Sequence, residues 1–167
     1  CRIIANDVYE NDAVRAYAEY VDLDTLYRES DIITIHTPLL PETTGMIDRE
    51  AIAKMKDGVV FIDNARGELM DIDAVPEAVE SGKFGALFMD AFPGETGIIH
   101  VPHDEDIIRT PGMPYFKLKY LRSFVNVYHT PHMAFFTEEA AEQMAECGVN
   151  SIYEILTEGK SKHEIPC

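Results

Sequence analysis

Short runs of apolar residues alternate along the chain with longer segments in which apolar side chains recur at helical spacing. The runs predict strands at 2–6, 32–36, 59–63, 85–89 and 125–128, and the helical spacing predicts helices at 23–29, 49–56 and 74–81. Strands that alternate with helices are typical of βαβ units, in which helices cover both faces of a parallel sheet. The pattern therefore predicts the α/β fold class.

Residues that favour helix ends support these boundaries. Asp48 can cap the helix that follows it, and Gly58 can end that helix. Asp73 can cap the next helix, whose first turn holds Pro76, where the missing N–H costs little. Both helices therefore have a predicted start.

The last third of the chain contains one long connection and one long helix. Residues 91–124 include four prolines and three glycines, and a stretch of this length predicts an elaborated active-site loop. Apolar residues at helical spacing predict an amphipathic helix over 137–157. Thr137 is its predicted cap, and Gly159 is its predicted end.

The charge of the chain limits its partners. Thirty acidic against 14 basic residues give a net charge of -16, which repels nucleic acids and anionic membrane surfaces. We therefore predict no nucleic-acid partner. An anionic substrate would need a local cationic clamp.

The cysteines and the hydropathy indicate a compartment. Cys1, Cys147 and Cys167 are an odd number and lie far apart, so neither a disulfide framework nor a zinc site is indicated. No apolar stretch approaches the length of a membrane span, and the N-terminus lacks the layout of a signal peptide. We expect a cytoplasmic protein without a membrane partner. Because the chain starts inside a strand pattern, we also expect it to be part of a longer chain.

Polar side chains follow the predicted strands where each strand ends. In open α/β sheets, ligands bind outside the carboxyl ends of the strands. The residues that directly follow the strands include Asp7, Thr37, Pro38, Asn64, Ala65, Arg66, Asp90, Thr130 and His132. This edge of the sheet is the predicted site.

Arg66, Glu95 and His132 form a set that suits hydride transfer to a 2-oxo acid. The planar fork of Arg66 can hold a carboxylate through two parallel hydrogen bonds, and Gly67 permits an unusual backbone turn beside it. A carboxylate such as Glu95 favours the protonated form of a hydrogen-bonded imidazole, which can then pass a proton. A surface arginine, an ordinary acidic residue and a structural histidine are the plain alternatives.

The other histidines are weaker candidates. His36 and His129 lie within or beside strand patterns and suit the core or a supporting role. The H-V-P-H motif at 100–103, with acidic residues after it, could bind a metal, but its spacing is poor for a rigid site. We therefore predict no metal site.

Two further features point to a dinucleotide. An acidic residue at the end of the second strand of such a fold accepts hydrogen bonds from the adenosine ribose. Asp7, which follows the strand pattern at 2–6, is a candidate for this role. Val8 and Tyr9 follow it, not Arg, so a 2′-phosphate would meet a negative charge, which favours NAD over NADP. The alternative is an Asp that only starts a turn. The proline-containing loop at 36–44 can wall a flat cofactor ring.

In order along the chain, these motifs resemble those of the D-isomer-specific 2-hydroxyacid dehydrogenases, and more narrowly the D-lactate dehydrogenase branch. The motifs are D-V-Y at 7–9, S-D-I-I-T-I-H-T-P-L at 30–39, M-K-D-G-V-V-F-I-D-N-A-R-G-E-L-M-D at 55–71, A-V-E-S-G-K-F-G at 78–85, M-D-A-F-P-G-E at 89–95 and H-T-P-H-M-A-F-F-T at 129–137. The resemblance covers nearly the whole chain.

The resemblance implies roles for the residues at the strand ends. His132 is the proton donor and acceptor, Glu95 its partner and Arg66 the substrate clamp. Asp7 binds the adenosine ribose, and Asp90 lies near the nicotinamide amide. The residues implied to line the NAD cofactor are Thr37, Pro38, Thr43, Asn64 and Ala65. The substrate is a small 2-oxo or 2-hydroxy acid, and the protein is a homodimer.

The resemblance also implies a domain layout. Residues 1–136 correspond to a Rossmann-like NAD-binding domain, a doubly wound parallel sheet that is incomplete on its N-terminal side. Its first strand, the G-x-G-x-x-G loop and the first helix are expected upstream of Cys1, and their place in the middle of the sheet predicts a split sheet. Residues 137–167 correspond to a helix that returns to the substrate domain and lacks part of its apolar partner.

The chain departs from the family pattern at two positions. Asp63 stands where the family usually has Asn, and Pro93 stands where the lactate branch often has Glu. Neither change removes a catalytic group, but Asp63 can alter the electrostatics behind Arg66. Phe135 and Phe136 could form an apolar wall for the substrate, with core packing as the equal alternative.

Two other functions stay open from the sequence. A non-catalytic NAD-sensing module of the corepressor type can keep the same three residues. A truncated remnant that binds nothing well is the second. The sequence does not identify which 2-oxo acid the dehydrogenase would reduce.

Overall fold

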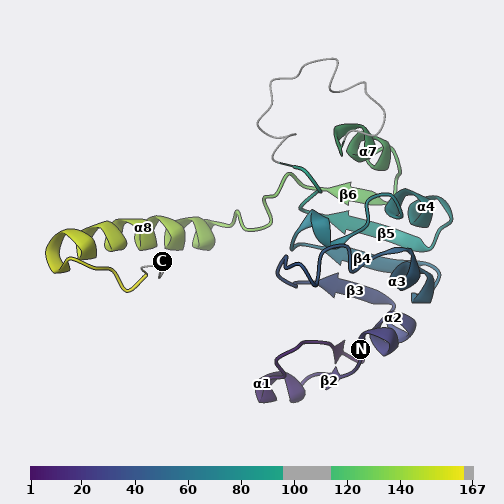
Figure 1. The fold of residues 1–167 in the computed structure, drawn as a ribbon, viewed down its shortest axis with the longest axis horizontal. Helices are drawn as coiled ribbons and strands as arrows, with labels where there is room; N and C mark the ends of the chain where they lie inside the picture. The colour runs from purple at the N-terminus through teal and green to yellow at the C-terminus, as the bar shows by residue number, and fades with distance from the viewer. Residues whose placement is uncertain (96–113, 164–167) are drawn as a thin grey trace. The chain divides into compact units, whose positions relative to one another are not determined.

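The computed structural model describes residues 1–95 and 114–163. The chain divides into two compact units, Cys1–Pro131 and His132–Cys167. Figure 1 shows both units and labels most of their helices and strands. The first unit contains the sheet and most of the predicted site residues.

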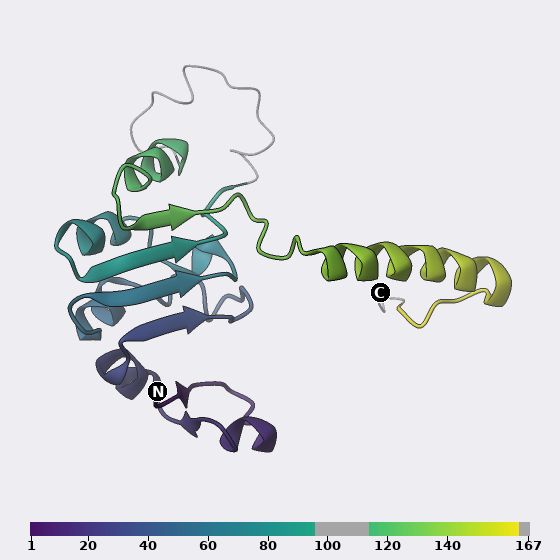
Figure 2. The same ribbon diagram turned by 180° about the vertical axis from the view of Figure 1, so that it is seen from behind.

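A four-stranded parallel sheet forms the centre of the first unit. Its strands are β3 (Ile32–Ile35), β4 (Val59–Asp63), β5 (Phe84–Met89) and β6 (Val127–His129), paired in that order. All pairs are parallel, and in Figure 2 the four arrowheads point the same way. The predicted α/β class with a parallel sheet is confirmed.

The two faces of this sheet differ in burial. Ile33, Phe61, Leu87 and Val127 are register partners and lie in the core, whereas Phe88 and Tyr128 on the opposite face are 37% and 53% exposed. The strands pair in the order in which they occur in the chain, so every crossover runs in the same direction across the sheet. Because crossovers between parallel strands are right-handed, all connecting helices lie on one face.

These helices are α3 (Arg49–Lys54), α4 (Val75–Glu80) and α7 (Pro114–Leu121). Within the described part of the first unit, the prediction of two covered faces therefore holds for one face only.

A second, smaller sheet precedes the first. It pairs β1 (Ile4–Ala5) in parallel with β2 (Glu19–Tyr20), and α1 (Asp12–Arg15) connects them. The separation into two sheets agrees with the predicted split. The sequence pattern predicted β1 but missed β2 and α1, because two-residue strands and a one-turn helix carry too few residues to show a period. Helix α2 (Leu23–Glu29) spans the predicted residues.

One of the two predicted helix caps is confirmed and one is wrong. The Asp48 side chain accepts a hydrogen bond from the backbone N–H of Ala51 at the start of α3. Helix α4 has Ala74 at its cap position without a side-chain bond. The carbonyl of Asp71 accepts from Ala74 and Val75 there, so the preceding turn, not the Asp73 carboxylate, satisfies these donors.

The predicted loop over 91–124 is wrong at its C-terminal end. Residues 114–121 form α7, whose Leu118 and Leu121 lie in the core. The many prolines of this stretch concealed the helix, although Pro114 stands at its first position, where proline is tolerated. Residues 96–113, including the H-V-P-H motif, lie outside the described residues.

The second unit contains one long helix, α8 (Glu138–Glu158). As predicted, the Thr137 side chain caps it by accepting from the N–H of Ala140, and Gly159 ends it; Gly159 has the left-handed conformation. None of its residues is buried, and Ile152 and Ile155 are 62% and 53% exposed. Its apolar residues therefore have no complete partner within the described residues.

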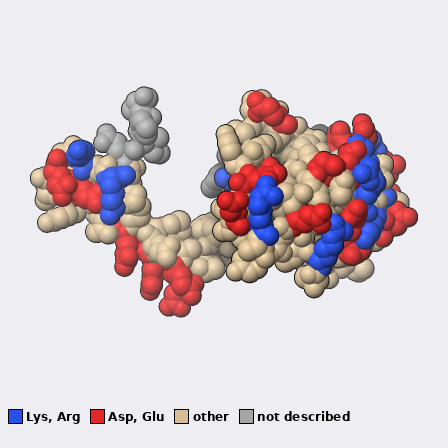
Figure 3. Space-filling view, turned by 90° about the horizontal axis from the view of Figure 1, so that it is seen from below, with Lys and Arg blue, Asp and Glu red and all other residues tan. Residues whose placement is uncertain are grey.

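Several cations on the surface of the first unit are paired with acids. Arg2 contacts Glu19 and Glu29, Lys54 contacts Asp24, and Figure 3 shows the two signs intermingled on the face that it draws. Exposed pairs of this kind add little stability, but they neutralise the cations locally. In the described part of the chain, no helix is long and apolar enough to cross a membrane.

Candidate active site

Most of the predicted site residues lie at one edge of the four-stranded sheet. Thr37 follows β3, Arg66 follows β4, Asp90 and Glu95 follow β5, and Thr130 follows β6. Because the strands are parallel, their carboxyl ends meet at one edge, where open α/β sheets bind ligands. Arg66 and Asn64 are exposed at this edge, whereas Asp90 is buried.

The loop after β4 presents Arg66. An Asp63 carboxyl oxygen accepts a hydrogen bond from the Ala65 N–H at 2.8 Å, which turns the chain out of the strand. Arg66 is exposed, and its Nη1 donates to the Ala65 carbonyl at 2.7 Å. The guanidinium forms no ion pair with a described residue. It keeps N–H donors that can bind an anion.

Gly67 brings the Arg66 loop against the loop after β5. Its φ is not positive, so the predicted reason for this glycine, an unusual backbone turn, is wrong. A Cβ here would lie 2.3 Å from the Phe92 carbonyl carbon and 2.4 Å from the Pro93 nitrogen. Only glycine permits this close approach of two backbones.

Glu95 belongs to a tight turn that the same contact holds in place. The Phe92 N–H donates to the Glu95 carboxylate at 3.2 Å, and the Glu95 N–H donates to the Phe92 carbonyl at 3.0 Å. The Gly94 N–H donates to the Glu68 carboxylate at 3.2 Å. Residues 66–68 and 92–95 are therefore joined at two points, which fixes the Arg66 and Glu95 loops as one block.

Replacing Gly67 with alanine is expected to push these two loops apart. We expect kcat/KM of the full-length protein for a 2-oxo acid to fall by about 10- to 100-fold, because small misplacements of catalytic groups are costly. Steady-state kinetics measure the loss. Gly148→Ala is the matched control because Gly148 lies in α8 without a positive φ, and an added Cβ would contact no described atom there. Normal kinetics in Gly67→Ala would contradict the role of the contact.

Asp90 anchors the end of β6 next to the end of β5. The residue is 3% exposed, and its carboxylate accepts from the Thr130 hydroxyl at 2.5 Å, while the Thr130 N–H donates to the Met89 carbonyl at 3.0 Å. Sequence reasoning gave Thr130 no role of its own. The repeated Thr-Pro after a strand, at 37–38 and 130–131, was the signal that pointed to it.

His132 follows Pro131 directly and begins the second unit. Its φ is 51°, and among the described residues it is the only non-glycine with a positive φ. Such backbone conformations cost about 1–3 kcal/mol and cluster at active sites. His132 therefore has an unusual conformation at the position that the sequence analysis selected.

His129 is the last residue of β6 and lies at this edge of the sheet. It is half-buried, and burial and the positive charge of Arg122 lower its pKa, while Asp90 and Glu95 oppose that shift. A lowered pKa keeps this imidazole neutral near pH 7. This agrees with the predicted supporting role. His129 is therefore the histidine whose variant should be compared with a variant of His132.

The loop after β3 is folded on itself. The Thr43 hydroxyl donates to the Pro38 carbonyl at 2.7 Å and accepts from the Leu40 N–H at 2.9 Å. Thr43 thus shapes the loop, whereas Thr37 is half-buried and Pro38 is exposed at its start. Asn64 is exposed beside them after β4.

Asp7 lies just beyond β1 and is exposed. Its carboxylate accepts from the Tyr9 N–H at 2.9 Å, which is the turn-starting geometry that the sequence analysis held as the alternative. The same carboxylate keeps acceptor capacity for a further hydrogen bond, because an ionised carboxylate has about four lone-pair sites. Both roles can therefore coexist.

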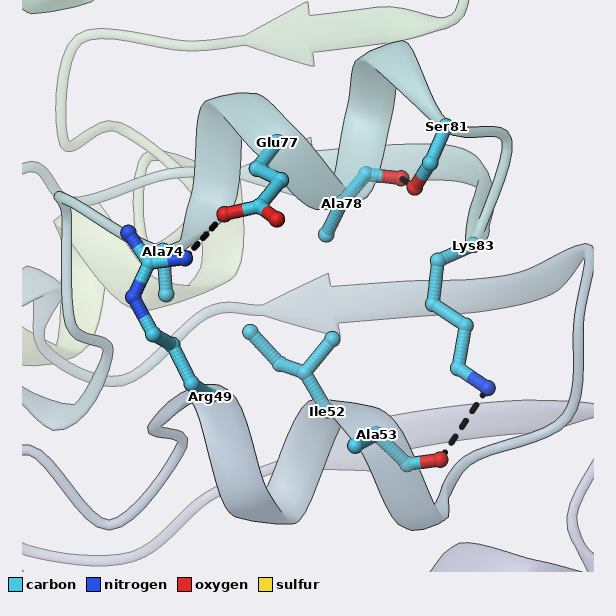
Figure 4. A pocket seen from close by; sticks show the side chains of 8 residues that line it. All are labelled: Arg49, Ile52, Ala53, Ala74, Glu77, Ala78, Ser81 and Lys83. Carbon is cyan, nitrogen blue, oxygen red and sulfur yellow. Dashed lines mark hydrogen bonds and ion pairs between the residues drawn. The ribbon is translucent and has the colours of Figure 1, made fainter.

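A groove between α3 and α4 lies apart from the predicted site residues. Its volume is about 300 Å³, and Figure 4 shows Arg49 and Lys83 near its two ends. Arg49 contacts Glu77, and Lys83 donates to the Ala53 carbonyl and to Asp57. Both cations are thus engaged within the protein, so the groove is a weaker candidate than the sheet edge.

Within residues 1–95 and 114–163, no cluster of three or more His, Cys, Asp or Glu could hold a metal. The chemistry of the described edge is that of a guanidinium, carboxylates, hydroxyls and an imidazole. Such groups bind carboxylates and sugar hydroxyls and transfer protons.

Comparison with known proteins identifies the family. The model of the NAD-binding domain of D-isomer specific 2-hydroxyacid dehydrogenases matches residues 1–134. The aromatic 2-oxoacid reductase of Clostridium sporogenes is 39% identical over 166 residues, which cover 99% of this chain and 49% of that protein. A D-lactate dehydrogenase of Lactobacillus delbrueckii subsp. bulgaricus is 38% identical over 160 residues, covering 95% and 46%.

Solved structures agree with these relatives. The crystal structure of D-lactate dehydrogenase with NAD+ from Lactobacillus jensenii matches with a TM-score of 0.87 and 34% identity, over 100% of this chain and 48% of that one. The chain spans about half the length of the curated relatives it matches. It belongs to the D-isomer-specific 2-hydroxyacid dehydrogenase family, and its residues 1–134 match that family's NAD-binding domain.

Proposed function

We propose that the full-length protein is an NAD-dependent D-2-hydroxyacid dehydrogenase that interconverts a 2-oxo acid and the D-2-hydroxy acid. The observation that carries this proposal is the block formed by the Arg66 and Glu95 loops at the carboxyl edge of the sheet. The block holds the exposed Arg66 guanidinium and the Glu95 carboxylate on loops that follow two adjacent strands, β4 and β5. The next strand, β6, leads through Thr130 and Pro131 to His132.

The polar groups at this edge fit a dinucleotide. Asp7 offers an exposed carboxylate to ribose hydroxyls, and Thr37 and Pro38 stand with Asn64 and Ala65 at the ends of two adjacent strands. We propose that these residues, with Thr43 shaping their loop and Asp90 at the end of β5, hold NAD. When bound, NADH supplies the hydride.

Arg66 binds the carboxylate of the 2-oxo acid. Its fork can donate two parallel hydrogen bonds, and this fixes the plane of the substrate as well as its position. Because Gly67 packs closely against residues 92–93, the backbone that carries the Arg66 guanidinium is already fixed before substrate binds. Less ordering is then needed when substrate binds.

His132 moves the proton that the reaction needs. Reduction of the carbonyl leaves negative charge on its oxygen, and an imidazolium N–H at that oxygen neutralises the charge as it forms. Glu95 stabilises the imidazolium and orients the ring. In the oxidative direction the neutral imidazole accepts the hydroxyl proton.

The side-chain specificity of the substrate rests on residues that this chain supplies only in part. Phe135 and Phe136 are 52% and 66% exposed and contact each other edge to face. We propose that they contribute apolar surface to the pocket for the substrate side chain. We further propose that the protein acts as a homodimer in the cytoplasm, as the sequence analysis implied.

Oxidation of NADH by the full-length protein tests the proposed function. We expect turnover with at least one member of a series from pyruvate to 2-oxoisocaproate and phenylpyruvate, measured by loss of absorbance at the NADH band. NAD binding without turnover on any member would contradict the proposal and favour an NAD-sensing module.

A further inference from the structure

Asp63 is a buried acid that the proposed mechanism does not use. It is the last residue of β4, and 0% of its surface is exposed. One carboxyl oxygen accepts from the Ala65 N–H, whereas Oδ2 is buried without a hydrogen-bond partner in the described structure. A buried charge with an unsatisfied oxygen is costly.

The neighbouring strands and helices offer this carboxyl little compensation. Its register partners, Ile35 and Met89, are apolar, and the residues that α3 and α4 bury on this face are Ala51, Ile52, Val75, Ala78 and Val79. Asp90, after β5, donates its backbone N–H to the Asp63 carbonyl. Its own carboxylate accepts from Thr130.

Two charged side chains act on Asp63. Glu68 disfavours its negative charge, and Arg66 favours it. Burial is the largest influence and raises the pKa of Asp63 to about 6, although the backbone N–H groups of Ala65 and Arg66 oppose the rise. Asp63 therefore changes its charge near pH 6, at the start of the loop that carries Arg66.

We propose that Asp63 is a positioning residue for Arg66, holding the Ala65–Arg66 backbone, and that ionisation of its buried carboxyl group weakens the binding of the substrate carboxylate. When Asp63 is neutral, the positive charge of Arg66 interacts with the substrate carboxylate without competition from Asp63. In the charged form Asp63 competes for that positive charge and repels the substrate. The inference rests on the proposed function of Arg66 as the carboxylate clamp.

The first consequence is a pH-dependent stability. Below about pH 4 the acid is protonated in both the folded and the unfolded state. Between about pH 4 and 6 the folded protein keeps a proton that the unfolded chain releases, so stability falls as pH rises. The folding equilibrium constant is expected to fall by about 100-fold at most, which is about 3 kcal/mol, because the pKa changes by about two units.

The second consequence is a pH-dependent affinity for anions. A bound carboxylate raises the pKa of a nearby acid. By reciprocity, ionisation of that acid weakens the binding of the carboxylate. We expect the affinity for oxamate, an unreactive 2-oxo acid analogue, to fall by about 3- to 10-fold between pH 5 and 7.5, because one pKa unit of coupling equals a tenfold change.

The experiment compares the full-length protein with Asp63→Asn, Asp63→Ala and the control Asp57→Asn. Asp57 has an exposed carboxylate that contacts Lys83, outside the site. Oxamate binding is measured by calorimetry with saturating NADH, and unfolding free energy by denaturant titration, both from pH 4.5 to 8. Taking the ratio of each variant's profile to the wild-type profile removes the titration of shared groups.

We expect Asp63→Asn to lose the wild-type fall in stability and the Asp63 part of the fall in affinity, and Asp57→Asn to retain both. Asp63→Ala should bind oxamate weakly at every pH because nothing then holds the Ala65 N–H. An Asp63→Asn profile that parallels wild type in both measurements would overturn the inference. Retained oxamate binding with this pH dependence, but no reduction of any 2-oxo acid, would sink the proposed function and leave the inference standing.

Discussion

Replacing Arg66 with alanine in the full-length protein is expected to lower kcat/KM for the 2-oxo acid by about 10²- to 10⁴-fold, since each hydrogen bond to a charged group contributes about 1.5–3 kcal/mol and two are lost. Most of the loss should appear in KM, because the carboxylate is bound in both the ground state and the transition state. Steady-state kinetics over a wide range of substrate concentration measure it.

Two variants sharpen this test. Arg66→Lys keeps the charge but not the planar fork, so it should recover only part of the loss. Arg49→Ala removes an exposed arginine on α3 that contacts Glu77 in the groove of Figure 4, and it should leave kcat/KM near the wild-type value. If Arg66→Ala kept wild-type KM and kcat, the carboxylate clamp would lie elsewhere.

Replacing His132 with asparagine is expected to lower kcat by about 10²- to 10⁴-fold in both directions, the usual contribution of a positioned general acid or base. Binding of NADH should be retained, because the imidazole acts on the substrate oxygen. Calorimetry with NADH, together with kcat for reduction and oxidation, separates the two effects.

His129 and His163 provide the comparison for this variant. His129 is half-buried at the same edge, while His163 follows α8. We expect His163→Asn to match wild type and His129→Asn to lose much less than His132→Asn. A large loss in His129→Asn combined with turnover in His132→Asn would reverse the assignment of the proton-transferring residue.

Local patterns in the sequence were sufficient for the strands and helices that bury one side. Strand β4 and helix α2 span the predicted residues, because alternating burial and helical periodicity leave direct traces in the residue types. The cap of α8 at Thr137 was likewise readable from residue type. The prediction failed where the deciding partner is remote in sequence, as with α7, whose Leu118 and Leu121 pack into the core among prolines that suggested a loop.

The same distinction applies to the candidate site. The strand-end positions of Arg66, Asp90 and Glu95 followed from parallel topology and needed no long-range contact. The reason for Gly67 could not be derived, because its neighbours Phe92 and Pro93 are brought there only by the fold. The sequence marked Asp63 as a departure from the family pattern, but its burial became evident only in the structure.

Isotope transfer tests the central claim most directly. The full-length protein is incubated with a 2-oxo acid that it turns over and with NADH carrying deuterium at both C4 positions of the nicotinamide ring. The product is then analysed by chiral chromatography and mass spectrometry. The account predicts a D-2-hydroxy acid with one deuterium at C2. A product without deuterium, or the L-isomer, would contradict it.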